Sequence, residues 1–224
     1  MLEFYLDTAD VDAVARFNSC LPIRGVTTNP SILAKAGIGI SRILPELASI
    51  LAGDARFFVQ VVSQTVDGMV EEARNIAALP YDLVVKVPAT ETGLTAIKLI
   101  KAENIQVLAT AIYTTHQGFL AALSGADYLA PYVNRIDVMG ADGIKVVADL
   151  QLLINQYGLK TKLLPASFKN SAQVVEVLKL GVAAITLPVD VTAQLLAHPA
   201  VQPAVDQFDV DWHCAFGNLL SFES

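Results

Sequence analysis

The chain has 224 residues, of which 54% are hydrophobic and 17% are charged, and its formal net charge is −7. This length and apolar content suffice for one large core, so a single domain over residues 1–224 is expected. The acidic balance argues against sequence-independent binding of nucleic acid, which requires a basic surface. No apolar run reaches the roughly 18 residues that a membrane-spanning helix needs, so no membrane contact is expected.

The N-terminus, the cysteines and the histidines narrow the class further. The first ten residues, MLEFYLDTAD, carry acids and lack the basic start of a secretory signal. Cys20 and Cys214 show no metal-ligand spacing, which fits a reduced, cytoplasmic protein. A zinc site is not expected, because His116, His198 and His213 include no pair four residues apart.

Short β-rich apolar runs alternate with helical patterns along the chain. We expect strands at residues 4–9, 25–29, 57–62, 83–88, 107–113, 128–134, 162–167 and 184–188. The periodicity predicts helices at residues 11–17, 40–51, 66–78, 93–103, 116–124, 142–157, 171–179 and 191–197. Strand–helix alternation indicates parallel pairing with right-handed crossovers.

Eight such units in one domain predict a closed (β/α)8 barrel, the TIM barrel of the α/β class. A doubly wound open sheet is the alternative, weakened because no G-x-G-x-x-G motif follows the first strand. A C-terminal helix is expected at about residues 200–217, with a tail at 218–224. In it Phe208, Trp212 and Phe216 recur at helical spacing, so it packs either on the barrel or on a neighbouring subunit.

Lys86 interrupts an otherwise apolar strand, LVVKVP at residues 83–88. An ammonium group is costly to bury without a partner. One interpretation is a lysine that snorkels from an edge strand or pairs with a carboxylate. The other is an amine whose pKa is lowered so that it can attack a carbonyl.

Polar residues recur near the ends of the expected strands. In a barrel, inward positions at the C-terminal strand ends form the active site. The residues at or near such positions are Asp7, Thr27, Asn29, Gln60, Lys86, Thr110, Tyr113, Tyr132, Asn134, Arg135, Ser167 and Lys169. Singly, each has a structural explanation: Asp7 can cap a helix, and Arg135 can pair with Asp137. Their convergence on one mouth indicates a binding site.

These residue types suit a carbonyl substrate that carries a phosphate. Asp7 can exchange a proton with a substrate hydroxyl, and Tyr132 is either a second proton donor or an aromatic rim residue. Arg135 offers a planar fork for a phosphate. Ser167 and Lys169, in SFKNS before a helix, add a hydroxyl, backbone amides and positive charge for the same group.

Two stretches, GVTTNPSIL (25–33) and VVKVPATETGL (84–94), resemble the signature sequences of the transaldolase family. YVNRID (132–137) and ASFK (166–169) fit in the same order, and the likeness covers almost the whole chain. The chain is most similar to the short members, the fructose-6-phosphate aldolases. The resemblance implies a (β/α)8 barrel and a Schiff base on Lys86, with neither a metal nor an organic cofactor.

The resemblance also implies a role for each site residue. The implied catalytic residues are Lys86, Asp7, Tyr132, Gln60 and Thr110, of which the last two hold a water. The implied substrate-binding residues are Thr27, Asn29, Arg135, Ser167 and Lys169, of which the last three bind phosphate. Transferase-type members typically carry glutamate where Gln60 stands and phenylalanine where Tyr132 stands, so this chain has the aldolase pair.

The activity implied by the resemblance is the reversible class I cleavage of fructose 6-phosphate to dihydroxyacetone and glyceraldehyde 3-phosphate. One alternative is a transaldolase of the pentose phosphate pathway, which passes the dihydroxyacetone unit to erythrose 4-phosphate. Another is a barrel that binds sugar phosphates without catalysis. The resemblance further implies a homo-oligomer in which pentameric rings pair into a decamer and the C-terminal helix reaches a neighbour.

Overall fold

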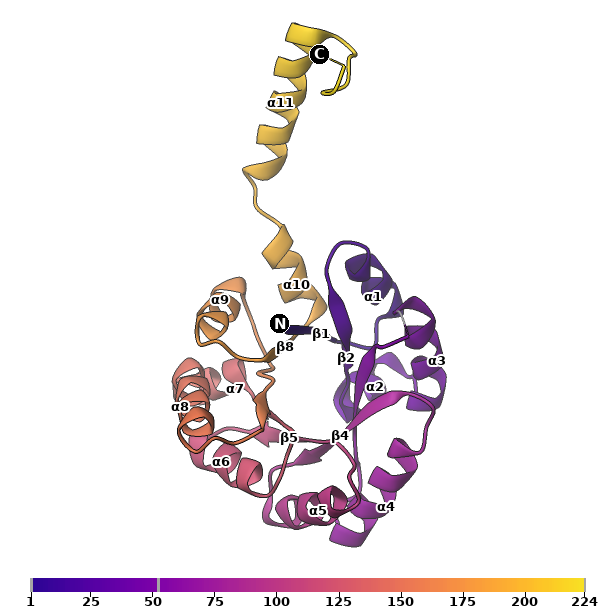
Figure 1. Ribbon diagram of the computed structural model, residues 1–224, viewed down its shortest axis with the longest axis vertical. Coiled ribbons are helices and arrows are strands. Elements are labelled where there is room, and N and C mark those ends of the chain that lie inside the picture. Colours follow the sequence, from indigo (N-terminus) through magenta and orange to yellow (C-terminus); the bar gives the residue numbers. More distant parts are fainter. Residues whose placement is uncertain (1, 52, 224) are drawn as a thin grey trace.

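The computed structural model describes residues 2–51 and 53–223. Within them, eight parallel strands lie side by side in chain order, with the eighth strand also beside the first and helices around the outside (Figure 1). The ring closes between the seventh and eighth strands, where the Thr186 N–H donates to the Pro165 carbonyl at 3.2 Å. The (β/α)8 barrel is confirmed. The doubly wound alternative is wrong, because the strand order never reverses.

The elements match the predicted alternation. The strands are β1 Glu3–Asp7, β2 Ile23–Thr27, β3 Arg56–Gln60, β4 Asp82–Pro88, β5 Val107–Ile112, β6 Tyr128–Pro131, β7 Lys162–Leu163 and β8 Ala184–Leu187. The helices are α1 Val11–Asn18, α2 Pro30–Ala36, α3 Ile40–Ile50, α4 Val66–Ala77, α5 Glu91–Ala102, α6 Thr115–Leu123, α7 Val133–Val138, α8 Gly143–Gln156, α9 Ser171–Lys179, α10 Val189–Leu196 and α11 Val201–Phe216. Every predicted strand and helix is present, with its ends shifted by a few residues.

Two short helices, α2 and α7, were not predicted. α2 begins after Asn29, whose side-chain oxygen accepts the Ile32 N–H at 3.0 Å, and Pro30 occupies the first turn. An Asn-Pro pair is a helix-start signal, since proline at that position loses no hydrogen bond. α7 begins at Val133, so the sixth strand ends earlier than predicted, although the Val133 N–H still bonds to the Ala166 carbonyl at 3.0 Å.

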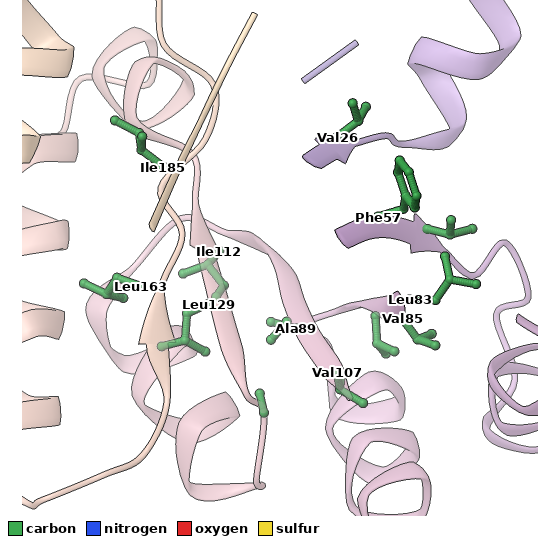
Figure 2. Close-up of a cluster of buried hydrophobic side chains, with 14 of the residues drawn as sticks. Val26, Phe57, Leu83, Val85, Ala89, Val107, Ile112, Leu129, Leu163 and Ile185 are labelled. Carbon is green, nitrogen blue, oxygen red and sulfur yellow. The ribbon is translucent and has the colours of Figure 1, made fainter. Parts of the chain in front are cut away.

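Alternation of side chains along the strands divides the core into two clusters. One cluster packs between the strands and the helices, and the members labelled in Figure 2 come from the segments of β2 to β8. The smaller cluster fills the barrel and contains Tyr5, Phe58, Val84, Leu108, Tyr128, Ala130, Leu164, Ala166 and Ala184. Lys86 stands two residues after Val84, so it shares this inward face and lies nearer the C-terminal end of β4.

A polar layer closes the other end of the barrel. The Glu3 carboxylate accepts hydrogen bonds from the Tyr5 hydroxyl at 2.8 Å and the Tyr128 hydroxyl at 3.0 Å, and it pairs with Lys162. Arg56 donates to the same Tyr128 hydroxyl at 2.7 Å. Because this layer lies at the N-terminal strand ends, its expected role is stability.

Helix α11 extends away from the barrel together with the segment after it (Figure 1). None of its residues is buried, and Val205, Phe208 and Phe216 are 49%, 69% and 44% exposed. The predicted C-terminal helix is confirmed, but packing on the outer surface of the barrel is wrong. Across residues 2–51 and 53–223, no helix combines the length and the hydropathy of a membrane span.

Candidate active site

A pocket of about 330 Å³ opens at the C-terminal ends of the strands. It is lined by Asp7, Asn29, Ser31, Ile32, Lys35, Lys86, Tyr132, Arg135, Ala166, Ser167 and Pro188. Ring closure therefore brings six of the ten predicted site residues to one cavity, although they come from five different strands or the segments that follow them. In the described part of the chain, no cluster of histidine, cysteine or acidic side chains could hold a metal ion.

Lys86 lies in this pocket with its amine held by the backbone. Its Nζ donates to the Thr28 carbonyl oxygen at 2.6 Å, and the residue is only 5% exposed. Burial lowers the pKa of the Lys86 ammonium below its usual range, while the nearby Asp7 carboxylate opposes the shift. The snorkelling interpretation is wrong, because β4 pairs on both sides and the side chain is buried.

Asp7 is oriented by two threonines on neighbouring strands. The Thr27 hydroxyl donates to Asp7 Oδ1 at 2.6 Å. The Thr186 hydroxyl lies 2.7 Å from that of Thr27 and must be the donor of this pair, since the Thr27 proton is already used. Asp10, not Asp7, caps α1, so the helix-cap alternative is wrong. Thr27 was expected to bind substrate, but it is buried and does not line the pocket. It contacts Asp7 instead.

Tyr132 carries its hydroxyl into the same region. That hydroxyl lies 2.8 Å from the Thr110 hydroxyl, and Thr110 itself is fully buried. The Tyr113 ring meets the Tyr132 ring edge-on with centroids 5.5 Å apart, and the Arg135 guanidinium lies 4.7 Å from its centroid. Burial raises the pKa of the Tyr132 phenol, although the hydrogen bond with Thr110 acts in the opposite direction. The phenol is therefore protonated at neutral pH and can donate a proton.

Arg135 and Ser167 form the side of the pocket suited to an anion. A hydrogen bond with Tyr113 raises the pKa of the Arg135 guanidinium, so the group is positively charged at neutral pH. The alternative ion pair with Asp137 is not formed: the two oxygens of that carboxylate instead accept the Gly143 N–H at 2.8 Å and a side-chain N–H of Gln173 at 2.7 Å. Ser167 has a φ of 61°, in the left-handed region that a serine rarely adopts. Strained backbone of this kind is typical of functional sites, and here it occurs at a residue that lines the pocket.

Four of the ten predicted site residues do not line this pocket: Thr27 and Thr110, which contact Asp7 and Tyr132, and Gln60 and Lys169. Gln60 is the register partner of Lys86, but it lines a neighbouring cavity of about 490 Å³. Lys169 is exposed and does not belong to the lining. Ser31 and Lys35 belong to it instead, and both lie on α2, the helix that was not predicted.

A family model described as Transaldolase/Fructose-6-phosphate aldolase matches residues 4–219. The chain belongs to this family. The match extends from β1 past the end of α11 and includes every predicted site residue. The predicted family is thereby confirmed, and with it an enzyme of the aldolase or transaldolase type, since the family description covers both activities.

Solved structures share the barrel with this transaldolase-family chain. A flavocytochrome b2 variant aligns with a TM-score of 0.60 at 13% identity, over 84% of this chain and 56% of the other. A thiamine phosphate pyrophosphorylase from Pyrococcus furiosus aligns with a TM-score of 0.54 at 19% identity, over 84% of this chain and 85% of the other. A putative isomerase from Sinorhizobium meliloti aligns with a TM-score of 0.63 at 11% identity, over 85% of this chain and 52% of the other. The chain thus spans little more than half of the first and third proteins, and identities this low show the fold alone.

Proposed function

We propose that this transaldolase-family enzyme is a class I aldolase that reversibly cleaves fructose 6-phosphate to dihydroxyacetone and glyceraldehyde 3-phosphate. The observation that carries the proposal is the buried Lys86 amine, whose pKa is lowered by burial, in one pocket with Arg135 and Ser167. An amine with a lowered pKa has a larger neutral, nucleophilic fraction at neutral pH. The other two residues offer a phosphate a charged fork and a hydroxyl.

The cleavage step uses Lys86 and Asp7. The Lys86 amine adds to the C2 ketone and water leaves, which gives an iminium ion on the lysine. Asp7, oriented by Thr27 at 2.6 Å, takes the proton of the C4 hydroxyl. The C4–O electrons then form the aldehyde, the C3–C4 bond breaks, and its electron pair is held by the iminium as an enamine. Glyceraldehyde 3-phosphate is the first product.

The release step needs a proton donor and a water molecule. Tyr132, or a water that it holds together with Thr110, protonates C3 of the enamine and restores the iminium. Hydrolysis of that iminium frees dihydroxyacetone and the Lys86 amine. The raised pKa of Tyr132 and its 2.8 Å contact with Thr110 support this assignment.

Reductive trapping tests the lysine. Borohydride with fructose 6-phosphate should fix one dihydroxyacetone unit on Lys86, seen as a mass increase in intact protein and located by peptide mapping. Lys86→Ala should abolish both trapping and turnover, whereas Lys98→Ala, on the exposed face of α5, should change neither. An adduct elsewhere in the pocket of Lys86→Ala would overturn the assignment.

A second candidate function, transaldolase activity, is favoured by one observation. Gln60, which the resemblance assigns to a catalytic water with Thr110 and Tyr132, lines the neighbouring cavity instead. If Gln60 holds no water for protonation of the enamine, the enamine persists until it adds to the aldehyde of an acceptor. Free dihydroxyacetone formed without erythrose 4-phosphate supports the aldolase, and turnover only with that acceptor makes the enzyme a transaldolase. A binding barrel without catalysis would show sugar-phosphate binding and no imine.

We further propose that α11 docks on a neighbouring copy in a homo-oligomer, with paired pentameric rings as the arrangement that the resemblance implies. The support is the row of exposed apolar side chains on a helix that extends away from its own barrel (Figure 1). Phe208→Glu, at a residue 69% exposed, should lower the mass measured by light scattering. An unchanged mass would exclude α11 as the contact.

A further inference from the structure

Tyr113 is a polar residue near a strand end to which the proposed mechanism gives no role. It follows β5 directly and is half-buried. Its ring meets the Tyr132 ring edge-on, with the centroids 5.5 Å apart and the ring planes at 80°. Edge-to-face contacts between aromatic rings are favourable and depend on orientation. Tyr113 therefore touches the proposed proton donor, although it does not line the pocket itself.

A β-bulge interrupts β5 near its C-terminal end. Ala109 pairs with Leu129 of β6 and Ile112 pairs with Pro131, so three steps along β5 match two steps along β6. Within this stretch Ala111 has a φ of 57°, in the left-handed region that alanine rarely adopts. An extra residue of this kind re-aims the side chains that follow it.

The side chains on either side of Ala111 show this change of face. Thr110 points into the barrel, where its hydroxyl lies 2.8 Å from that of Tyr132. Ile112, two residues later, belongs to the outer cluster between the strands and the helices. In a regular strand these two residues would share one face. Because the bulge reverses the alternation, Tyr113 takes the inward face on which Thr110 also lies.

The backbone hydrogen bonds of β5 change direction at the same place. The Thr110 carbonyl accepts the Ala89 N–H at 2.8 Å, on the side of β4. The Ile112 carbonyl accepts the Tyr132 N–H at 3.0 Å, on the side of β6. Carbonyls two residues apart in a regular parallel strand point to the same neighbour, so these two bonds identify the bulge independently of the side chains.

Three contacts restrain the Tyr132 side chain. Thr110 meets its hydroxyl, Tyr113 meets the edge of its ring, and the Arg135 guanidinium lies 4.7 Å from the ring centroid. Two of these contacts come from β5 and the residue after it, one before and one after the bulge. A proton donor must be held within hydrogen-bond reach of the atom that it protonates. Thr110 fixes the position of the hydroxyl, and Tyr113 fixes the plane of the ring.

We propose that Tyr113 is a positioning residue, which holds the Tyr132 ring in the orientation from which its phenol, or the water that it holds, protonates C3 of the enamine. The inference rests on the proposed function, because that proton transfer is its release step. The bulge at Ala111 turns Tyr113 into the barrel. Loss of the Tyr113 ring should accordingly slow the proton transfer and leave imine formation on Lys86 intact.

Deuterium exchange into dihydroxyacetone isolates this step. The ketone forms the iminium on Lys86 without any phosphate. In D2O, reversal of the protonation step removes a proton from C3 and its repetition returns a deuteron, which NMR follows. Tyr113→Leu should slow the exchange about tenfold, because the ring of Tyr132 is then free to turn. Borohydride trapping of dihydroxyacetone should be unchanged. Tyr113→Phe keeps the ring and should exchange at the wild-type rate.

The matched control is Tyr81→Leu. Tyr81 is also half-buried and meets the Phe57 ring edge-on at 6.2 Å, but it lies just before β4, at the opposite end of the barrel. Its loss should leave the exchange rate unchanged. Equal slowing in this control would overturn the inference, because a general loosening of the barrel would then be the cause.

The remaining outcomes separate the inference from the proposed function. An exchange rate of Tyr113→Leu within about twofold of the wild type, with normal trapping, would overturn the inference alone. An equal loss in Tyr113→Phe would also overturn it, since the hydroxyl and not the ring would then act. A parallel loss of trapping in Tyr113→Leu would assign Tyr113 to imine formation instead. Failure to trap the wild-type protein would overturn both the inference and the proposed function.

Discussion

Replacing Glu3 by glutamine separates the stability of the barrel from its chemistry. The Glu3 carboxylate accepts hydrogen bonds from the Tyr5 and Tyr128 hydroxyls at 2.8 and 3.0 Å and pairs with Lys162 at the N-terminal ends of the strands. Glutamine has nearly the same shape but no charge, so the packing of the barrel interior is preserved. The change therefore removes electrostatic interactions from a layer that does not line the candidate active site.

The expected loss follows from the three contacts. Each of the two hydrogen bonds from a tyrosine hydroxyl changes from charge-assisted to neutral, which lowers the free energy of unfolding by about 1 kcal/mol per bond. The Lys162 side chain is 44% exposed, so solvent screens its ion pair and the pair contributes less than about 1 kcal/mol. The free energy of unfolding of Glu3→Gln should therefore be lower than that of the wild type by about 2–3 kcal/mol at pH 7.

The difference should depend on pH. Burial by itself raises the pKa of the Glu3 carboxyl, but the hydrogen bonds from Lys162, Tyr5 and Tyr128 together outweigh it, and the pKa lies below its usual value. A lowered pKa contributes stability above the unfolded-state pKa of about 4.3, and this contribution is lost as the pH falls through the lowered folded-state pKa. The two proteins should accordingly become alike in acid, where protonated Glu3 resembles glutamine.

Urea unfolding at a fixed protein concentration, repeated between pH 7 and pH 3, measures this difference. A double-mutant cycle with Tyr128→Phe should give a coupling energy of about 1 kcal/mol. A loss below about 0.5 kcal/mol, or one that does not change with pH, would refute the charge-assisted network. The turnover number should stay within about twofold of the wild type, and a tenfold fall, about 1.4 kcal/mol, would show that the layer reaches the chemistry.

Three further predictions concern the pocket and the strands. Thr27→Val removes the 2.6 Å hydrogen bond to Asp7 and should lower kcat by about 10- to 100-fold in steady-state assays; an unchanged kcat would exclude Asp7 as an oriented base. Asp7→Asn removes the charge that raises the Lys86 pKa, so the pH of half-maximal borohydride trapping should fall, and a rise would contradict the coupling. Gly25→Ala would place a Cβ 1.8 Å from the carbonyl oxygen of Arg56 in β3, so the free energy of unfolding should fall by about 3 kcal/mol or more, and a wild-type urea midpoint would refute this close contact.

Much of the fold could be predicted because its signals are local. Apolar runs of strand length alternate with helical periodicity, and this alternation alone indicates parallel βα units. The polar residue within an apolar strand, Lys86, was visible for the same reason, since the cost of burying an ammonium does not depend on the fold around it. α2 could also have been predicted from Asn29 and Pro30, a capping residue followed by a proline suited to the first helical turn.

Which of the ten predicted residues fall outside the pocket, and which others join the rest, could not be predicted from the chain alone. Lys169 and Lys35 are both basic residues after barrel strands, yet only Lys35 lines the pocket, because the positions of α2 and α9 set which side chain reaches it. Gln60 and Lys86 are register partners, yet they line different cavities. Periodicity and residue chemistry therefore specify the eight βα units and the nucleophile candidate, because both are properties of short segments. Ring closure decides the rest, because it brings the ends of strands far apart in the sequence to one mouth and thereby determines which side chains line one pocket.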